Sequence, residues 1–322
     1  MKRYSRLLVS ALVCALPLLG QAADYPDKTI TWVVPYPAGG GTDVVARTLA
    51  NEMSKSLGQP IVIENKPGAN TAIGASQVAR ARNDGYTIGS ADNATLALNQ
   101  HLFPQLSYSP VSDFDYVGGL ARFPYVLVVN PSVPVNTVDE LLALAKQKPG
   151  TLSYGSPGMG APNHVAMALL QQRTGTAFLH VAYRGAAPVM QDLIAGQIQF
   201  ALIDTASSIQ YIQSKRVRPI AVSTEKRLAS LPDVPTFAEA GVPDFVAFSW
   251  QGMIVPKTTP APVIEKLNTA LSAALATQSV KQALTAMGVE PAGSTPAQFR
   301  QFVGDQDKLW GKVIRDAKIS LN

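Results

Sequence analysis

Residues 35–43 read PYPAGGGTD, and this stretch separates an apolar run, residues 30–34, from a segment with helical spacing, residues 44–50. The pattern predicts a strand, a glycine turn and the start of a helix. Three glycines let backbone N–H groups approach a ligand, and the first helical turn adds unpaired donors at the positive end of the helix dipole. The stretch therefore predicts an anion-binding loop or, as an equally open alternative, a tight turn whose glycines serve packing alone.

The loop matches neither of the common nucleotide-binding motifs. It lacks the lysine of GxxxxGK[ST], and its glycines do not have the spacing of GxGxxG. A small carboxylate is the ligand that fits this pattern best.

A second glycine loop occurs in the other half of the chain. Residues 153–164 read SYGSPGMGAPNH and again predict a strand followed by a helix. Two helix N-termini facing each other across a cleft would hold opposite ends of a small ligand. Two unrelated βα turns are the alternative, because such turns are common in α/β proteins.

The N-terminus has the pattern of a secretory signal peptide. Lys2, Arg3 and Arg6 precede an apolar stretch, residues 7–19, and small residues lie before a plausible cleavage site after residue 22. The apolar stretch is shorter than the roughly 20 residues that span a bilayer. We therefore expect residues 1–22 to be removed and the protein to work in the periplasm. Cys14, the only cysteine, lies within this segment, so the mature chain is expected to have no disulfide.

The composition allows a large core. Of the residues, 47% are hydrophobic and 15% are charged, which suits two domains of ordinary size. The formal net charge is +5, but the basic residues are scattered and form no run that would follow a phosphate backbone. No nucleic-acid partner is expected.

Strand and helix patterns alternate along the chain, as in an α/β fold with mainly parallel sheets and helices on both faces. No single linker rich in proline, glycine and serine divides the sequence. This favours one lobe inserted into the other. We expect one lobe from residues 23–124 plus 223–322, and a second, inserted lobe from residues 125–222.

The chain resembles the Bug-type extracytoplasmic solute receptors of the tripartite tricarboxylate transporter family. The resemblance covers essentially the whole mature chain. It is carried by PYPAGG with Thr42, Asp43 and Arg47, by NKPGA (65–69), DGYT (84–87) and residues 156–164, and by YRG (183–185), GQ (196–197) and WQG (250–252). The resemblance implies a two-lobed, type II-like periplasmic binding protein with a double crossover hinge, which delivers a carboxylated solute to the integral-membrane subunits of a transporter.

The resemblance also implies a binding mode. In the first loop, backbone groups of residues 38–41 and ordered waters would hold one carboxylate. In the second loop, the Ser156 hydroxyl and backbone N–H groups would hold the far end of the solute. The candidate substrate-binding residues are Tyr36, Ala38, Gly39, Gly40, Gly41, Thr42, Asp43, Ser156, Gly158, Gly160, Ala161 and Asn163.

Further candidates are positional, namely Ser90, Tyr183, Asp204 and Trp250. Each has an ordinary structural alternative. Asp204 ends a strand, where ligand sites of open α/β sheets gather, but an aspartate there also forms turns. Trp250 is a candidate wall for an aromatic ligand or a packing residue at the lobe boundary. Asp43 is a candidate helix cap as much as a ligand contact.

An enzyme is the main rival class. The three histidines form no HxH or HExxH pattern, so no metal site and no cofactor are expected. Ser156 with His164 suggests an exported serine hydrolase, but the sequence around Ser156 is not GxSxG, and Pro157 removes a typical oxyanion donor. We expect a monomeric binding protein and no enzyme. A sensor in place of a transporter stays open as the partner. The solute class also stays open among di- and tricarboxylates, amino acids and aromatic acids.

Overall fold

The computed structural model describes residues 25–321, and the predicted signal peptide lies outside this range. Within the described range, no helix is both long and apolar enough to cross a membrane. The elements are, in chain order, β1 (Ile30–Val34), α1 (Gly41–Leu57), β2 (Ile61–Asn65), α2 (Ala72–Ala79), β3 (Thr87–Asp92), the π-helix η1 (Ala94–Leu98), α3 (Asn99–Leu102), β4 (Phe114–Val129), α4 (Val138–Gln147), β5 (Ser153–Ser156), α5 (Pro162–Thr174), β6 (Leu179–Ala182), α6 (Ala186–Ala195), β7 (Phe200–Asp204), α7 (Thr205–Gln213), β8 (Arg218–Val222), β9 (Phe248–Pro256), α8 (Ala261–Ala276), α9 (Gln278–Ala286), β10 (Glu290–Pro291) and α10 (Pro296–Asp316).

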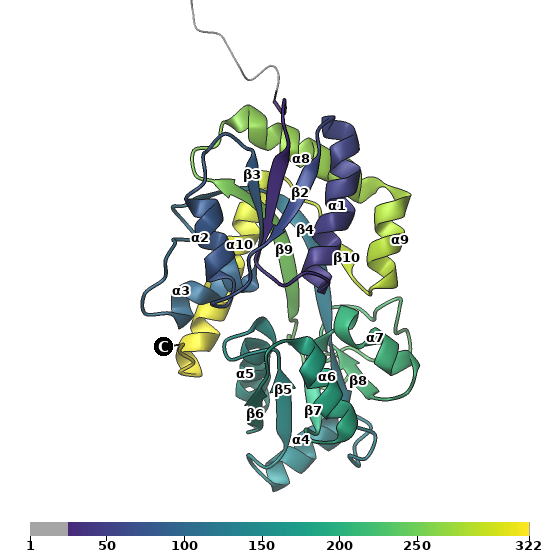
Figure 1. The fold of residues 1–322 in the computed structure, drawn as a ribbon. Coiled ribbons are helices and arrows are strands. Elements are labelled where there is room, and N and C mark those ends of the chain that lie inside the picture. Colours follow the sequence, from purple (N-terminus) through teal and green to yellow (C-terminus); the bar gives the residue numbers. More distant parts are fainter. Residues whose placement is uncertain (1–24, 322) are drawn as a thin grey trace, which may run out of the picture.

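The strands form two sheets that share β4, and each sheet is the centre of one lobe (Figure 1). Sheet A has the order β2-β1-β3-β9-β4, with β10 beside β4. Sheet B has the order β8-β4-β7-β5-β6. We name the part of the molecule built on sheet A lobe A and the part built on sheet B lobe B. The predicted two-lobed α/β fold is confirmed.

The strand pairing is more mixed than the sequence suggested. β1 pairs in parallel with β2 and β3, and β5 pairs in parallel with β6 and β7. The pairs made by β4 and β9 are antiparallel. These two strands lie at the centre of the molecule, and the chain enters lobe B through β4 and returns to lobe A at β9. Because β4 and β9 run in opposite directions between the lobes, they pair antiparallel.

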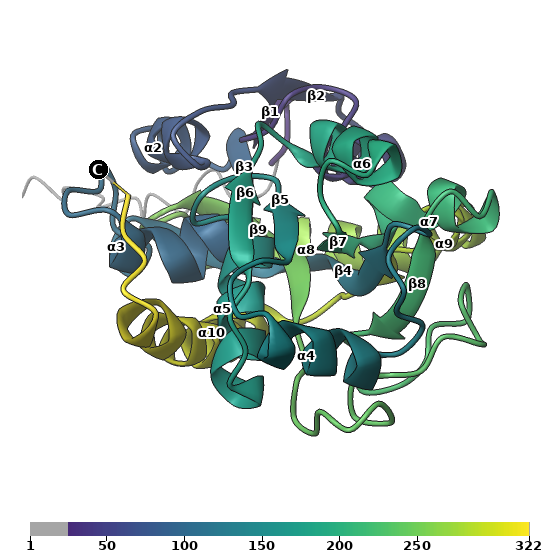
Figure 2. The same ribbon diagram turned by 90° about the horizontal axis from the view of Figure 1, so that it is seen from below.

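Helices cover both faces of each sheet. α1, α8 and α9 pack on one face of sheet A, and α2 and α10 pack on the other. In lobe B, α6 and α7 cover one face of the sheet, and α4 and α5 cover the opposite face (Figure 2). The core that holds α2 and α10 continues into the core beneath α4 and α5. The two lobes therefore share packed apolar contacts on that side.

Residues 224–246 pack on lobe B, although they follow the last strand of that sheet. Leu228, Leu231 and Val234 join the core beneath α6 and α7. The Phe237 N–H donates to the Val222 carbonyl oxygen over 3.1 Å, which ties the segment to β8. At its end, Phe248 pairs with Pro124 in sheet A. By these contacts, the segment packs with lobe B.

Candidate functional site

The two glycine loops both lie at the boundary between the lobes (Figure 1). The first glycine loop, residues 35–41, connects β1 to α1 in lobe A. The second glycine loop, residues 157–161, connects β5 to α5 in lobe B. Because β1 and β5 both end at this boundary, the N-termini of α1 and α5 are also brought there.

The first loop presents bare backbone at the start of α1. Gly39 has a φ of 83°, a left-handed conformation that suits glycine. Gly40 is the extended N-cap residue, and no side chain caps the helix. Ala38, Gly39 and Gly40 are exposed. The first N–H groups of α1 have no intrahelical acceptor, so they are available to an anion or to water.

Asp43 braces this loop from within. Its carboxylate accepts hydrogen bonds from the Gly39 N–H (2.9 Å), Arg47 Nε (2.8 Å) and Asn65 Nδ2 (2.8 Å), and the side chain is almost fully buried. Burial alone would raise the pKa of Asp43, but these donors together hold it below its ordinary value. The carboxylate is thus neither the N-cap nor a free ligand group, and its role in this structure is to fix the loop.

Tyr36 anchors the other end of the loop. Its hydroxyl donates to the buried carboxylate of Asp92, which also accepts from the backbone N–H and the hydroxyl of Thr95, both at 2.9 Å. Burial raises the pKa of Asp92, and the hydrogen bonds from Tyr36 and Thr95 oppose that rise. The aromatic ring is therefore held against β3 before any solute arrives.

The second loop is braced by uncharged groups. Ser156 is fully buried, and its Oγ lies 2.9 Å from the Gly158 carbonyl oxygen and 2.6 Å from His180 Nε2. The Gly160 N–H donates to His164 Nδ1 over 3.0 Å, and Gly160 has a φ of 71°. The Ser156 hydroxyl, which was expected to contact the solute directly, is hydrogen-bonded inside the loop in this structure.

The histidines beneath the second loop form a stack. The rings of His164 and His180 lie 3.9 Å apart at an interplanar angle of 10°, and Tyr154 stacks on the other side of His180. Burial lowers the pKa of both histidines to about 4, with His180 contributing to the shift of His164. Both rings are therefore neutral near pH 7, and His164 Nδ1 can accept from Gly160.

The hydrolase hypothesis named the wrong histidine. His180, and not His164, lies within hydrogen-bond distance of Ser156. In residues 25–321, no hydrogen bond joins His180 to a carboxylate that would orient it, and Ser156 is 0% exposed. A nucleophile needs access to its substrate as well as a base. The geometry does not support hydrolysis at this serine.

The N-terminus of α5 completes the second loop. Ala161 is the N-cap residue and Pro162 occupies the first turn. Asn163 is buried and donates to the Leu202 carbonyl oxygen over 3.1 Å, which ties the helix start to β7. Gly158 is half-buried, and a Cβ added there would meet only the Tyr183 carbonyl oxygen, at 3.7 Å. There is thus room for a side chain at Gly158, although its N–H and its carbonyl oxygen are both hydrogen-bonded to the Ser156 hydroxyl.

The lobes touch each other beside the first loop. A Cβ added at Gly41 would lie 3.4 Å from the ring of Phe123 and 3.7 Å from Ala206, at the start of α7 in lobe B. Thr205 donates across the boundary to the Gly288 carbonyl oxygen over 2.5 Å. The first loop therefore faces the N-terminus of α7, and Thr42, in the first turn of α1, is half-buried there.

The four positional candidates have different outcomes. Ser90 is buried and accepts from Trp32 Nε1 over 2.9 Å, so it lies below the rim where it was expected. Trp250 is buried against α10, as the packing alternative had it, and donates to Gln306. The Tyr183 hydroxyl turns away to Asp192.

Asp204 lies at the boundary, at the start of α7. It is the N-cap residue of α7 and accepts from the Ser207 N–H over 2.8 Å. Burial raises the pKa of its carboxyl, which is opposed by the hydrogen bonds from Ser207. Within sheet B, its pairing partner on the adjacent strand β4 is Tyr125.

Several residues at the boundary were not singled out by the sequence. They are Asn65, Asp92, Phe123, Tyr125, His180, Ser249 and Gln251. Most of them lie in strands in which the neighbouring residues are apolar, so the sequence pattern there indicates only a buried strand. Asn65 had a usable signal, because it ends a strand parallel to β1 and belongs to the quoted motif NKPGA.

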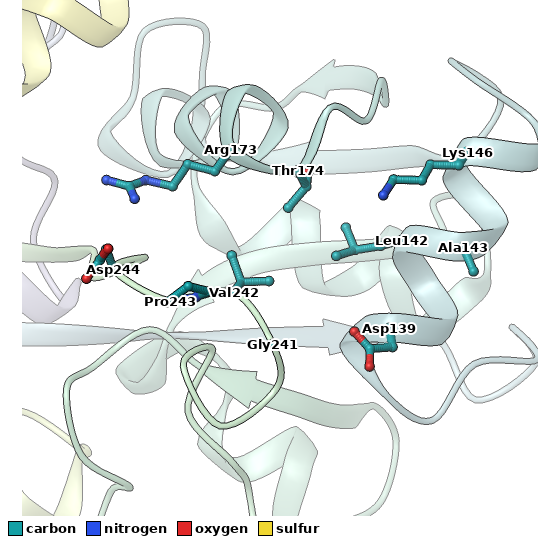
Figure 3. A pocket seen from close by; sticks show the side chains of 10 residues that line it. All are labelled: Asp139, Leu142, Ala143, Lys146, Arg173, Thr174, Gly241, Val242, Pro243 and Asp244. Atoms are coloured by element: carbon teal, nitrogen blue, oxygen red, sulfur yellow. The ribbon is translucent and has the colours of Figure 1, made fainter.

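A cavity of about 640 Å³ lies elsewhere, on the outer side of lobe B (Figure 3). It is bounded by α4, by the last residues of α5 and by the turn at residues 241–244. The second glycine loop is at the opposite end of α5, about 20 Å away for a helix of this length. Lys146, Arg173, Asp139 and Asp244 give this cavity a mixed charge, which does not single out an anionic solute.

In residues 25–321, no three histidine, cysteine, aspartate or glutamate residues lie close enough together to hold a metal ion.

Known proteins resemble this chain over nearly its full length. Protein BugT of Bordetella pertussis is 36% identical over 93% of this chain and 92% of its own. A solved structure described as R. palustris Rpa4515 with adipate is 35% identical, with a TM-score of 0.85 over 92% of this chain and 99% of its own. MatC from Rhodopseudomonas palustris with bound malate is 32% identical, with a TM-score of 0.80 over 90% of this chain and 100% of its own.

The model of the family described as "Tripartite tricarboxylate transporter family receptor" matches residues 45–319. This range includes the second glycine loop and the strands that carry the lobe crossings. The chain belongs to this family of periplasmic solute-binding receptors.

Proposed function

We propose that the protein captures a small carboxylated solute between its two lobes and delivers it to a tripartite tricarboxylate-type membrane transporter. The observation that carries the proposal is the pair of glycine loops, one on each lobe, which place the N-termini of α1 and α5 at the same boundary. The adipate and malate complexes of two similar proteins agree with a carboxylate as the solute.

The binding groups in this proposal are the backbone N–H groups of residues 38 and 40–43 in the first loop and of Met159 and Asn163 in the second, together with ordered water. The N–H groups of Gly39, Gly158, Gly160 and Ala161 are hydrogen-bonded within the loops, and Pro162 has none. Neutral donors and helix N-termini stabilise a carboxylate without a buried cation. Such a site also allows release, because it avoids the stronger bidentate ion pair that an arginine forms. Asp43, Tyr36, Ser156 and the two stacked histidines hold the loops in shape.

Closure follows from contact with both loops. A solute shifts the equilibrium between open and closed lobes only if it binds the closed state more tightly. A carboxylate held by one loop alone would contact both states equally. A solute that spans the two loops gains its second contact only when the lobes approach, so it favours closure.

The division into lobes is part of the same proposal. We place the first crossing at residues 124–125, as the sequence suggested. Residues 224–246 pack against the core beneath α6 and α7, which favours a second crossing at residues 247–248 in place of 222–223. Lobe B would then comprise residues 125–247.

A thermal-shift screen tests the proposal. The purified protein is heated with mono-, di- and tricarboxylates, amino acids and aromatic acids. A solute at 100 times its Kd adds about 2.7 kcal/mol to the free energy of unfolding, which raises Tm by several degrees. A shift confined to one class of carboxylate supports the proposal. Folded protein without co-purified solute that responds to no member of the panel contradicts it.

Two loop variants locate the site. In Gly40→Val and Gly158→Val, the added Cβ meets no atom closer than 3.7 Å, so the fold should tolerate it while the larger side chain covers the backbone donors. We expect both variants to lose solute binding. Gly304→Val is the matched control, because that glycine of α10 has no atom within 4 Å of an added Cβ. Normal affinity in both loop variants would contradict the assignment of the site.

A further inference from the structure

Gln251 carries an unexplained buried polar atom. Its Oε1 is fully buried, and no donor in residues 25–321 lies within hydrogen-bond distance of it. The residue as a whole is 3% exposed. Buried side-chain oxygens are nearly always hydrogen-bonded, so this acceptor calls for a donor from outside the chain, either an ordered water or a bound solute.

The direction of this side chain follows from its neighbours on β9. Trp250 packs on Phe299 of α10, and a Cβ added at Gly252 would overlap the same ring. Side chains alternate along a strand, so Gln251 points to the opposite face of sheet A, where Met253 packs in the core beneath α1. Gln251 therefore lies on the side of the sheet where α1 begins at the first glycine loop.

The surroundings of Gln251 belong to the lobe boundary. Asp92 of β3 lies directly opposite Gln251 of β9, and its carboxylate accepts the hydrogen bond from Tyr36 of the first loop. Two residues back along β9, the Ser249 hydroxyl lies 2.5 Å from that of Tyr125, at the crossing into sheet B. We name these five residues, Tyr36, Asp92, Tyr125, Ser249 and Gln251, the polar floor.

The charges near the polar floor are negative. Burial raises the pKa of Tyr125, and the nearby carboxyl groups of Asp204 and Asp92 add to the rise. No lysine or arginine within residues 25–321 is hydrogen-bonded to either carboxyl group. A solute carboxylate is therefore disfavoured at the floor, and it would bind at the N-termini of α1 and α5 instead. A hydrogen-bond donor on the solute is favoured at the floor.

We propose that Gln251 Oε1 accepts a hydrogen bond from the solute, and that the protein selects carboxylates with a hydroxyl or ammonium group on the carbon chain over the same carboxylates without one. This inference rests on the proposed function, since it assumes that the carboxylates occupy the two loops. It assigns Gln251 as a specificity-determining residue.

Isothermal titration calorimetry with matched solutes tests the inference. The solutes are succinate, glutarate and adipate, each compared with its 2-hydroxy derivative in both enantiomers and with its 2-amino derivative. We expect at least one donor-bearing compound to bind about tenfold more tightly than its unsubstituted partner, because an unpaired buried acceptor penalises the partner without a donor. A plain dicarboxylate that binds as tightly as all its derivatives overturns the inference and leaves the proposed function intact.

The variant Gln251→Met removes the acceptor and keeps the side-chain length. We expect the preference to fall to below about threefold, while ligand-free Tm stays the same or rises because an orphaned acceptor is gone. Gln147→Met, at the exposed end of α4, makes the same chemical change away from the boundary and should keep the full preference. An unchanged preference in folded Gln251→Met protein refutes the role of Gln251. Absence of heat for every solute refutes the proposed function, and this inference with it.

Discussion

The two glycine loops have the same chain geometry but are held in different ways. The first is braced by charge, since Asp43 joins the Gly39 backbone to Arg47 and Asn65. The second is braced by neutral groups, since Ser156 is hydrogen-bonded to His180, and Gly160 donates to His164. Both arrangements leave the helix N-termini without a side-chain cap.

This difference shows that a glycine loop is shaped mainly by what lies beneath it. The glycines permit the backbone conformation, but hydrogen bonds from buried side chains select it. The hydrogen bonds of the Asp43 carboxylate are strong and do not change with pH above the pKa of that group. The hydrogen bonds of His164 and His180 in the second loop depend on neutral imidazole rings. The loops should therefore respond differently to mutation and to acid.

Removal of the charged brace should have the largest effect. Asp43→Ala leaves the Gly39 N–H and the Asn65 amide without their acceptor, and we expect it to lower the free energy of unfolding by about 2–3 kcal/mol and to abolish solute binding. Urea denaturation measures the first effect and calorimetry the second. Asp316→Ala, which breaks an exposed pair with Lys312, should change neither. Stability equal to wild type in Asp43→Ala would show that the first loop holds its shape by other means.

Acid should weaken the second loop before the first. The pKa of His164 and of His180 is about 4 in the folded protein and 6.5 unfolded, so between these values the unfolded chain binds more protons. Stability contributed by the neutral rings is therefore lost as pH falls from 6.5 towards 4. The pKa of Asp43 lies below its ordinary value, so the charged brace persists through this window.

The double variant His164→Asn/His180→Gln isolates this effect. Asparagine keeps an acceptor near the position of Nδ1, and glutamine keeps a polar atom near Nε2, but neither titrates. Urea denaturation at pH 6.5 and pH 4.5 should show a smaller loss of stability in the variant than in the wild type. An equal loss in both proteins would place the acid sensitivity at groups other than these two histidines. The buried carboxyls of Asp92 and Asp204 would not account for it, because their raised pKa values make the folded state more stable as pH falls.

Much of the fold could be predicted from the sequence because its patterns are local. The alternation of apolar runs and helical segments indicated the α/β class, and the two loops were identified from glycine spacing alone. The first half of β4 shows where such local patterns fail. Gly118 and Gly119 suggest a break, yet they are inside the strand, where a Cβ would lie within 3 Å of the backbone oxygens of Ser294 and Ala292. These glycines permit close packing, which depends on residues far away in the sequence.

The candidate site could be predicted only in part, for the same reason. Each glycine loop is formed by contiguous residues, so its position could be predicted from the sequence. Their braces join distant segments, as Tyr36 with Asp92 and Ser156 with His180 show. The spacing of Ser156 and His164 suggested the wrong pair, because His180 reaches Ser156 through the parallel pairing of β5 and β6. Gln251 belongs to the quoted segment WQG, but the burial of its side-chain oxygen without a hydrogen-bond donor becomes visible only in the folded structure.

Alanine substitutions at Gly39 and Gly40 compare a position with a left-handed backbone to a neighbour with an extended backbone. Gly39 has a φ of 83°, whereas Gly40 is extended with a φ of −77°. Gly39→Ala should lower the free energy of unfolding by about 1 kcal/mol, and Gly40→Ala should change it by less than about 0.5 kcal/mol. Urea denaturation of the two variants side by side provides the measurement. Equal effects would mean that the loop adopts another conformation in solution.

The smallest expected effect separates a brace from a ligand contact in the second loop. Ser156→Ala removes a neutral hydroxyl that is hydrogen-bonded to Gly158 and His180, so the free energy of unfolding should fall by about 1 kcal/mol. If Ser156 acts only within the loop, the solute Kd should change less than about twofold, because none of its bonds reaches the boundary. A Kd about fivefold weaker with unchanged stability would instead restore Ser156 as a direct contact, and the hydroxyl would then have to leave His180 when the solute binds.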